Sequence, residues 1–266
     1  KADLSAFWFG PWPNEQKHSD YQKNDGAPGI YNLDATPYES LMLGFFSVWQ
    51  GPENDVCAAD NVIKRNQIMV GYSRDGYSWY REDMNPFMAV NSDRKAWNNG
   101  NLQSVAGSPV IVGDKLYFYL SGRRLEGTNE ITTTGLAILR RDGFASMKGT
   151  GELLTGKLVF SGEHFFVNVN VNGSLQVELL DSNGKVIPGF TKSDCKTVKG
   201  DAVKQKIEWN GNATLSSLKN KTIKVKFYVT DGEIYSFWIS PEATGESLGY
   251  TAGGGAGLHS SGIDKK

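Results

Sequence analysis

Apolar runs of strand length alternate along this chain with short clusters of Gly, Asn, Asp and Pro, and the 3.6-residue periodicity of amphipathic helices is almost absent. This pattern predicts an all-β protein. In the first part of the chain the expected strands are Leu41–Trp49, Asn66–Ser73, Ser108–Val112, Leu116–Ser121 and Gly135–Arg141. Tight turns are expected at Asp75-Gly76, Gly113-Asp114 and Asp142-Gly143.

Long polar segments separate these strands at 51–64, 82–107 and 124–134, and each is expected to form a loop. The polar segment 31–40 is likewise expected to be a loop that enters the apolar strand at Leu41. Binding residues are commonly carried by long loops on a scaffold of short strands. The sequence therefore places a site of the first part on these loops.

The chain changes character near residues 149–156, where Gly-Thr-Gly-Glu precedes a second series of strands. These are Phe165–Val171, Ser174–Asp181, Val203–Trp209, Thr222–Thr230 and Glu233–Ile239, with short turns such as Ser182-Asn183-Gly184 and Asp231-Gly232. Alternating apolar and polar positions within them predict a two-sheet β-sandwich. We place the domain boundary near residue 150, so that the domains are 1–150 and 151–266, the second with a glycine-rich tail over 244–261.

Composition narrows the classes of function. The chain has 266 residues, 39% hydrophobic content and a formal net charge of −1, which gives no electrostatic footprint for nucleic acid or an anionic membrane. No stretch approaches the roughly 20 apolar residues that a membrane-spanning helix needs. Aromatic residues make up 12% of the chain, which suits stacking on sugar rings as well as core packing.

The sequence gives no support for a metal site or a cofactor. Cys57 and Cys195 lie far apart, form no Cys-x-x-Cys pair, and are accompanied by only 3 scattered histidines. A disulfide between the two cysteines is an open alternative, but two separate thiols are favoured.

Several motifs run through most of the chain. They are Tyr-Asn-Leu-Asp-Ala-Thr-Pro-Tyr-Glu-Ser at 31–40, Gly-Tyr-Ser-Arg-Asp-Gly-Tyr-Ser-Trp at 71–79, Leu-Tyr-Phe-Tyr-Leu-Ser-Gly-Arg at 116–123, Leu-Arg-Arg-Asp-Gly-Phe-Ala-Ser at 139–146, Val-Glu-Leu-Leu-Asp at 177–181, Gly-Phe-Thr-Lys-Ser-Asp-Cys at 189–195 and Ile-Tyr-Ser-Phe-Trp at 234–238. Together they resemble bacterial glycoside hydrolases of the family 32 and family 43 type. The resemblance implies a five-bladed β-propeller followed by a β-sandwich, an oligosaccharide or polysaccharide ligand, and a periplasmic or extracellular location.

The chain also departs from that family pattern. The resemblance implies catalytic acids drawn from the first three blades, which converge at a central funnel. Residues 1–150 supply only about three blades at typical strand and loop lengths, and they resemble the later part of the propeller. We therefore expect a partial propeller that lacks the first blades.

Two carboxylates are candidate catalytic residues. Glu39 stands beside Tyr38 and ahead of an apolar strand, where partial desolvation raises the pKa of a carboxyl group and suits a general acid. Asp34 is the candidate second carboxylate, because glycoside hydrolysis needs two flanking the bond. The alternatives are an acid hydrogen-bonded at a strand entrance for Glu39 and a turn-forming acid for Asp34.

Other candidates are predicted to contact the substrate rather than to react. They are Tyr38, Asp93, Arg94, Trp97, Gln103 and Arg123. The guanidinium group of Arg123 is suited to a bidentate contact with a sugar, and an ion pair with Asp142 is the alternative. For the loop residues the alternative is an ordinary exposed surface. Asp75 is expected to accept hydrogen bonds within its own turn, with Trp79 packed beneath it.

Three functions remain open from the sequence. The first is a glycoside hydrolase-like protein that binds and hydrolyses a glycan, with Glu39 as general acid. The second is a noncatalytic carbohydrate-binding protein, favoured by the lack of a second convincing acid. The third is a structural or interaction module.

Overall fold

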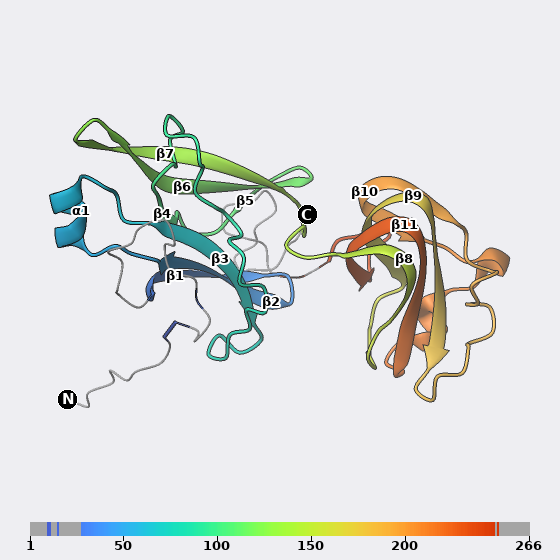
Figure 1. The fold of residues 1–266 in the computed structure, drawn as a ribbon. Coiled ribbons are helices and arrows are strands. Elements are labelled where there is room, and N and C mark those ends of the chain that lie inside the picture. Colours follow the sequence, from blue (N-terminus) through green and yellow to red (C-terminus); the bar gives the residue numbers. More distant parts are fainter. Residues whose placement is uncertain (1–9, 12–14, 16–27, 248, 250–266) are drawn as a thin grey trace, which may run out of the picture. The chain divides into compact units, whose positions relative to one another are not determined.

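The computed structural model describes residues 10–11, 15, 28–247 and 249, and within them the chain divides into two compact units (Figure 1). The first unit comprises the described residues up to Val112 together with Leu116–Ile138. The second comprises Gly113–Lys115 and the described residues of Leu139–Gly249. The division falls near residue 139, ahead of the boundary near 150 expected from the sequence. Most of the predicted glycine-rich tail lies outside the described residues.

A three-stranded antiparallel sheet begins the first unit, in the order β1-β2-β3. Its elements are β1 (Gly29–Tyr38), β2 (Leu41–Trp49) and β3 (Asn66–Ser73), with the short helix α1 (Asn54–Asp60) between β2 and β3. The bounds predicted for β2 and β3 are confirmed. The loop predicted over 31–40 is wrong, because these residues pair with β2 as strand β1 and turn only at Glu39-Ser40.

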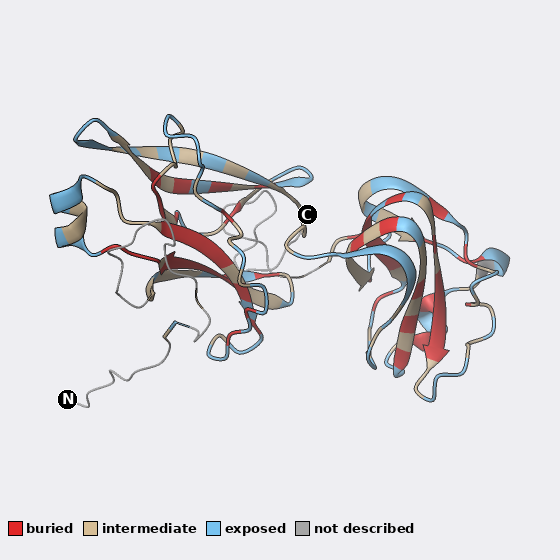
Figure 2. Cartoon of the chain, viewed as in Figure 1, coloured by how far each residue is buried: buried red, intermediate tan, exposed pale blue. Residues whose placement is uncertain are grey.

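Strand β2 is buried on both faces, as the red ribbon in Figure 2 shows. Phe45 and Phe46 are consecutive, so their rings point to opposite faces, and both are 0% exposed. On one face the ring of Phe45 lies 5.4 Å from that of Phe118 and 6.1 Å from that of Phe87. These aromatic contacts join the sheet to the next part of the unit.

The opposite face of β2 is covered by the segment that follows β3. The ring of Trp79 meets that of Phe46 edge-on at 5.6 Å, and the guanidinium group of Arg81 lies 5.6 Å from the same ring. Arg81 also forms an ion pair with Glu15, and both side chains are almost fully buried. Burial lowers the pKa of Arg81 to about 10.

The turn after β3 is held by Asp75, as expected. Oδ1 of Asp75 accepts hydrogen bonds from the backbone N–H groups of Ser78 at 2.7 Å and Tyr77 at 2.9 Å, and from the hydroxyl of Ser73 at 2.9 Å. The turn returns the chain so that Tyr72 and Tyr80 exchange backbone hydrogen bonds. This geometry directs Trp79, which is 8% exposed, into the core.

The second sheet of the first unit is built on one long strand. Its strands are β4 (Asn101–Val105), β5 (Val110–Val112), β6 (Lys115–Glu126) and β7 (Asn129–Arg140), and β6 pairs with the other three. The loop predicted over 124–134 is wrong, since β6 and β7 continue through it and turn only at Gly127-Thr128. Exposed polar residues such as Thr132 and Thr134 hid this hairpin from the hydrophobic pattern.

The second unit contains a four-stranded antiparallel sheet in the order β10-β9-β11-β8. Its strands are β8 (Met147–Leu154), β9 (His164–Asp181), β10 (Val198–Ile207) and β11 (Ile223–Ser240), with short 3-10 helices η1 (Asn210–Asn212) and η2 (Leu215–Leu218) between β10 and β11. Two pairs of predicted strands are each one continuous strand, β9 and β11. Asp231-Gly232 forms a bulge within β11 rather than the predicted turn. Asp231 has a positive φ of 43°, a backbone conformation found in both bulges and turns, so the sequence motif did not distinguish them.

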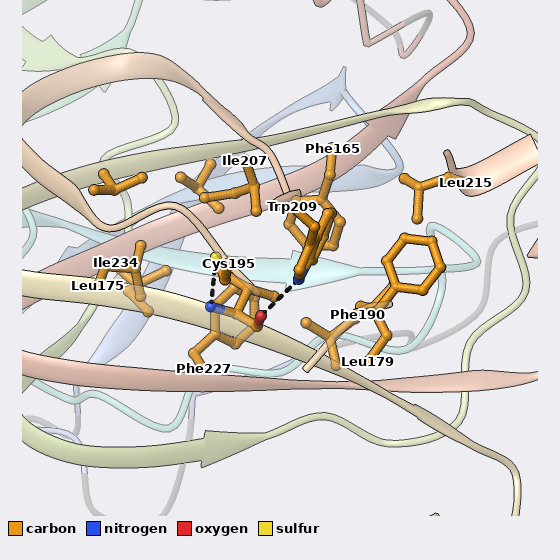
Figure 3. Close-up of a cluster of buried hydrophobic side chains, with 14 of the residues drawn as sticks. Phe165, Leu175, Leu179, Phe190, Cys195, Ile207, Trp209, Leu215, Phe227 and Ile234 are labelled. Carbon is orange, nitrogen blue, oxygen red and sulfur yellow. Dashed lines mark hydrogen bonds between the residues drawn. The ribbon is translucent and has the colours of Figure 1, made fainter. Parts of the chain in front are cut away.

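The core of the second unit lies on one face of this sheet (Figure 3). Alternate residues of β9, from Phe165 to Leu179, enter it together with Phe227 of β11. Trp209 donates its indole N–H to the backbone oxygen of Val177 at 3.0 Å, so the buried indole nitrogen has a partner (Figure 3).

The all-β class is therefore confirmed: strands dominate, and the described residues form three sheets, none of them closed. Complete propeller blades and a two-sheet sandwich stay predictions. None of the helices among the described residues is long and apolar enough to cross a bilayer. Cys57 and Cys195 are both free thiols.

Substituting Gly44 by Ala is expected to destabilise the protein by about 1–3 kcal/mol, because the added methyl group overpacks a filled core. A Cβ atom at Gly44 would lie 2.6 Å from the ring of Trp79 and 2.9 Å from Leu33. Urea denaturation measures the change. The matched control is Gly29→Ala on β1, where the nearest atom would lie 3.7 Å away. Equal midpoints for both variants would contradict this packing.

The turn at Asp75 predicts a pH-dependent stability. Hydrogen bonds from the N–H groups of Ser78 and Tyr77 and from the hydroxyl of Ser73 hold the pKa of Asp75 well below its usual range. A depressed folded-state pKa gives stability that is present above the unfolded pKa of roughly 3.9 and is lost as the pH falls towards the folded value.

Asp75→Ala should therefore lower the melting temperature at pH 7, and the gap to the wild type should narrow as the pH falls below about 4. Thermal melts at a series of pH values measure this gap. Glu82→Ala, an exposed acid beyond the turn, is the control and should show no such convergence. A gap that stays constant down to pH 3 would exclude this role of the carboxylate.

Candidate functional site

Side chains of β1 and β4 meet between the two sheets of the first unit, and we call this region the β1/β4 seam. Asp34 Oδ2 accepts the backbone N–H of Val105 at 3.0 Å. Gln103 donates its side-chain amide to the hydroxyl of Tyr31 at 3.0 Å. Polar residues of β1 thus bind to the neighbouring sheet, which explains how a polar segment forms a strand.

Both members of the Tyr31–Gln103 hydrogen bond occupy β-bulges. The register of β1 on β2 shifts between Ile30 and Asn32, which leaves Tyr31 as the extra residue. The register of β4 on β6 shifts between Leu102 and Ser104, which leaves Gln103 as the extra residue. A bulge re-aims a side chain and is over-represented beside active sites. Two bulges on strands of different sheets therefore direct these side chains toward each other.

The seam contains polar atoms without a hydrogen-bond partner among the described residues. They include the side-chain amide oxygens Oδ1 of Asn32, Oδ1 of Asn101 and Oε1 of Gln103. All three oxygens are shielded from solvent, and a buried polar group without a partner costs about 1–3 kcal/mol. Tyr31 is 48% exposed, and the ammonium group of Lys64 lies 5.2 Å from its ring centre. The seam thus combines an accessible aromatic ring with amides and a cation.

The two predicted catalytic carboxylates lie at different places on β1. Asp34 accepts hydrogen bonds from the side chain of Asn32 at 2.9 Å and from Val105 N–H. Glu39 is half-buried in the two-residue turn between β1 and β2, with a φ of 51°. At 3.3 Å per residue, their Cα atoms are up to about 16 Å apart. Their catalytic roles stay predictions.

The remaining predicted contact residues are scattered over the first unit. Tyr38 is 5% exposed at the end of β1, so its side chain lies in the interior. Asp93 caps a loop turn by accepting the N–H of Lys95 at 2.9 Å, and Arg94 is exposed on the same loop. The hydrogen bonds of Asp34 and Gln103 go to Asn32, Val105 and Tyr31, and not to this loop.

Trp97 packs on the hairpin of β6 and β7, and Arg123 is a residue of β6. The indole of Trp97 lies directly against Gly122 and Gly135, where no larger residue would fit. Its ring is therefore partly used in packing. Arg123 forms an ion pair with Glu130 at 2.7 Å, and its pairing with Asp142 considered from the sequence stays a prediction. Nε of Arg123 has no hydrogen-bond partner among the described residues.

Of the predicted residues, the structure brings only Asp34 and Gln103 to the same seam. Sequence reasoning missed Tyr31, Asn32 and Lys64 as members of the site. The motif at 31–40 included Tyr31 and Asn32, but no pattern in the sequence revealed the bulges that orient them.

Comparisons with known proteins give few matches. No family model and no curated protein matches the chain. Among solved structures, the chain is similar to the crystal structure of a "putative glycoside hydrolase" from Parabacteroides distasonis, with 14% sequence identity and a TM-score of 0.31. The match covers 61% of this chain and 53% of that chain, so the matched part spans about half of the other protein. At this TM-score the likeness carries no weight for function.

Proposed function

We propose that the first unit binds carbohydrate at the β1/β4 seam, as the binding part of a glycoside hydrolase-like protein. The observation that carries the proposal is the pair of β-bulges that aim Tyr31 and Gln103 at each other across two sheets. The amide of Gln103, the phenol of Tyr31 and the nearby ammonium group of Lys64 supply hydrogen-bond donors and acceptors that suit sugar hydroxyls. The accessible ring of Tyr31 offers a flat apolar surface for a sugar.

This proposal includes the partial-propeller architecture. The two sheets would be neighbouring blades, with β1 and β4 as the strands that border the central funnel. Support comes from the side-chain hydrogen bonds between β1 and β4 and from the packing of Phe45 on Phe118. The proposed location is periplasmic or extracellular, where polymeric glycans occur, and the second unit would be the accompanying sandwich domain.

Binding is favoured over hydrolysis by Asp34 and Glu39 acting as a pair. Asp34 lies within the ladder of β1, whereas Glu39 lies in the turn that ends it, with Cα atoms up to about 16 Å apart. Glycosidases hold their two carboxyl groups roughly 5 to 9.5 Å apart. Asp34 is also engaged by two donors of the protein itself. Hydrolysis by this chain would therefore require a different carboxylate as the partner of Glu39.

Glu39 as a general acid is the second candidate function, and its backbone favours it. A glutamate at a φ of 51° occupies a left-handed conformation that glycine or asparagine adopts more readily. Such local strain is concentrated at functional sites. The half-buried position of the side chain also suits a carboxyl group that must hold a proton.

Removing the seam's polar contacts should weaken carbohydrate binding. The wild-type chain is screened on a glycan array, and the best ligand is then titrated by calorimetry against Gln103→Ala and Tyr31→Ala. Each variant should bind about 5- to 10-fold more weakly, because one hydrogen bond contributes about 1 kcal/mol. Tyr119→Ala, which removes a comparably exposed tyrosine of β6, is the control and should bind normally. No glycan bound, or equal affinities for all four proteins, would refute the proposal.

The catalytic role of Glu39 is tested on any glycan that the chain cleaves. Glu39→Gln should lower kcat by about 10²-fold or more, because proton transfer by a placed acid contributes that much. Chromatography of the released sugars measures the turnover. Glu53→Gln, an exposed acid ahead of α1, is the control. Unchanged turnover in Glu39→Gln removes this residue from the mechanism.

A further inference from the structure

A polar groove lies on the outer face of the sheet in the second unit. Because Val225 and Phe227 of β11 point into the core, the alternate residues point outward. The register places Tyr228 between Glu152 of β8 and Gln176 of β9. The groove above this row has a volume of about 190 Å³.

The far end of the groove carries hydroxyl groups. Thr230 pairs with Ser174 of β9, one outward position beyond Tyr228 and Gln176. Thr150 of β8 and the bare backbone of Gly151 complete this end. The sheet register therefore gathers hydroxyl and amide groups from three strands on one concave surface.

Lys192 forms the wall of the groove, and its turn is fixed to β9. Its backbone N–H donates to Oε2 of Glu178 at 3.1 Å, and its backbone oxygen accepts the amide of Gln176 at 3.0 Å. Its ammonium group lies 4.3 Å from the ring centre of Tyr228. The backbone of this turn is thus fixed beside the groove, and the exposed side chain of Lys192 reaches the Tyr228 ring.

The hydroxyl of Tyr228 is anchored by a buried carboxylate of the neighbouring strand β9. Its hydroxyl donates to Oε1 of Glu178 at 2.8 Å, and Glu178 is 9% exposed. Burial, and then the hydrogen bond to Glu178, raise the pKa of Tyr228, so its hydroxyl stays a neutral donor. The floor of the groove is therefore rigid before a ligand arrives.

Two carboxylates, of Glu152 and Glu178, and two ammonium groups, of Lys226 and Lys192, border the groove. Glu152 is paired with Lys226 at 2.8 Å, and the ammonium group of Lys226 lies 4.8 Å from the Tyr228 ring. Glu178 of β9 pairs with Lys226 in the sheet register, on the same outer face, and it accepts the Tyr228 hydroxyl and the Lys192 N–H. Lys192 has no ion-pair partner among the described residues. An anionic group placed in the groove would supply that partner.

We propose that this groove binds an acidic saccharide, a sugar ring that carries a carboxylate. The carboxylate would pair with the ammonium group of Lys192, and the ring hydroxyls would bind Ser174, Thr230 and Gln176. A small carboxylate alone would leave the hydroxyl end of the groove to water. A neutral sugar would leave Lys192 without its counter-charge. This site is separate from the β1/β4 seam and does not rest on the function proposed for it.

The test titrates the ¹⁵N-labelled full chain with galacturonic acid and, in parallel, with galactose. These sugars differ only at C6, which is a carboxylate in one and a hydroxymethyl group in the other. The amides of Gly151, Ser174 and Thr230 should shift with galacturonic acid, and galactose should bind about tenfold more weakly, the size of one charge-assisted hydrogen bond.

Substitutions of Lys192 distinguish binding in the groove from non-specific attraction of an anion to surface lysines. Lys192→Ala should weaken galacturonic acid about tenfold, and Lys192→Arg should largely restore it. The turn should survive both changes, because it is held through the backbone of Lys192. Lys199→Ala, at an exposed lysine of β10, is the matched control and should bind as the wild type does.

The proposal is overturned if both sugars bind with equal affinity, or if Lys199→Ala loses as much affinity as Lys192→Ala. It is also overturned if acetate causes the same shifts at the same affinity, or if no amide shifts at all. The proposal would also be overturned if only the amides of Gln103 and Val105 shifted and if the same shifts occurred in Lys192→Ala. That result would support the seam as the carbohydrate site. Failure at this groove is thus distinguishable from failure at the seam.

Discussion

The burial of β2 on both faces is the constraint on which the first unit depends. Because Phe45 and Phe46 are adjacent and both fully buried, the sheet needs a layer of cover on each side. Phe118 of β6 supplies part of one layer, and Trp79 with Arg81 supplies the other. The contact of Phe45 with Phe118 positions the second sheet. The Asp75 turn matters because it places Trp79 against Phe46 on the opposite face.

In both proposed sites the pairing of strands decides where the polar side chains point, but in different ways. At the β1/β4 seam the regular ladder is interrupted, and the bulges at Tyr31 and Gln103 turn side chains toward a common place. In the groove the ladder is regular, and its register alone aligns Glu152, Tyr228 and Gln176 in one row. Both arrangements fix polar groups on strands, which holds them more precisely than mobile loops would.

The sequence predicted those parts of the fold in which hydrophobicity alone decides the structure. Continuous apolar runs gave β2 and β3 their correct bounds, because both strands are largely buried. The same reasoning missed β1, whose Asp34 is polar because it binds the next sheet rather than water. Asp34 and Gln103 were both singled out from the sequence, and both lie at the seam. The bulges that aim Tyr31 and Gln103 depend on pairing between distant strands, which local patterns do not reveal.

Cys195 connects the core of the second unit to the turn that carries Lys192. Cys195 follows Lys192 by three residues, and its sulfur accepts the backbone N–H of Val177 at 3.2 Å (Figure 3). Burial raises the pKa of this thiol, so it is unreactive while the turn stays on β9. Its rate of modification by an alkylating reagent would then follow the transient detachment of the turn. The alkylation rate of Cys195 therefore reports how often this segment opens.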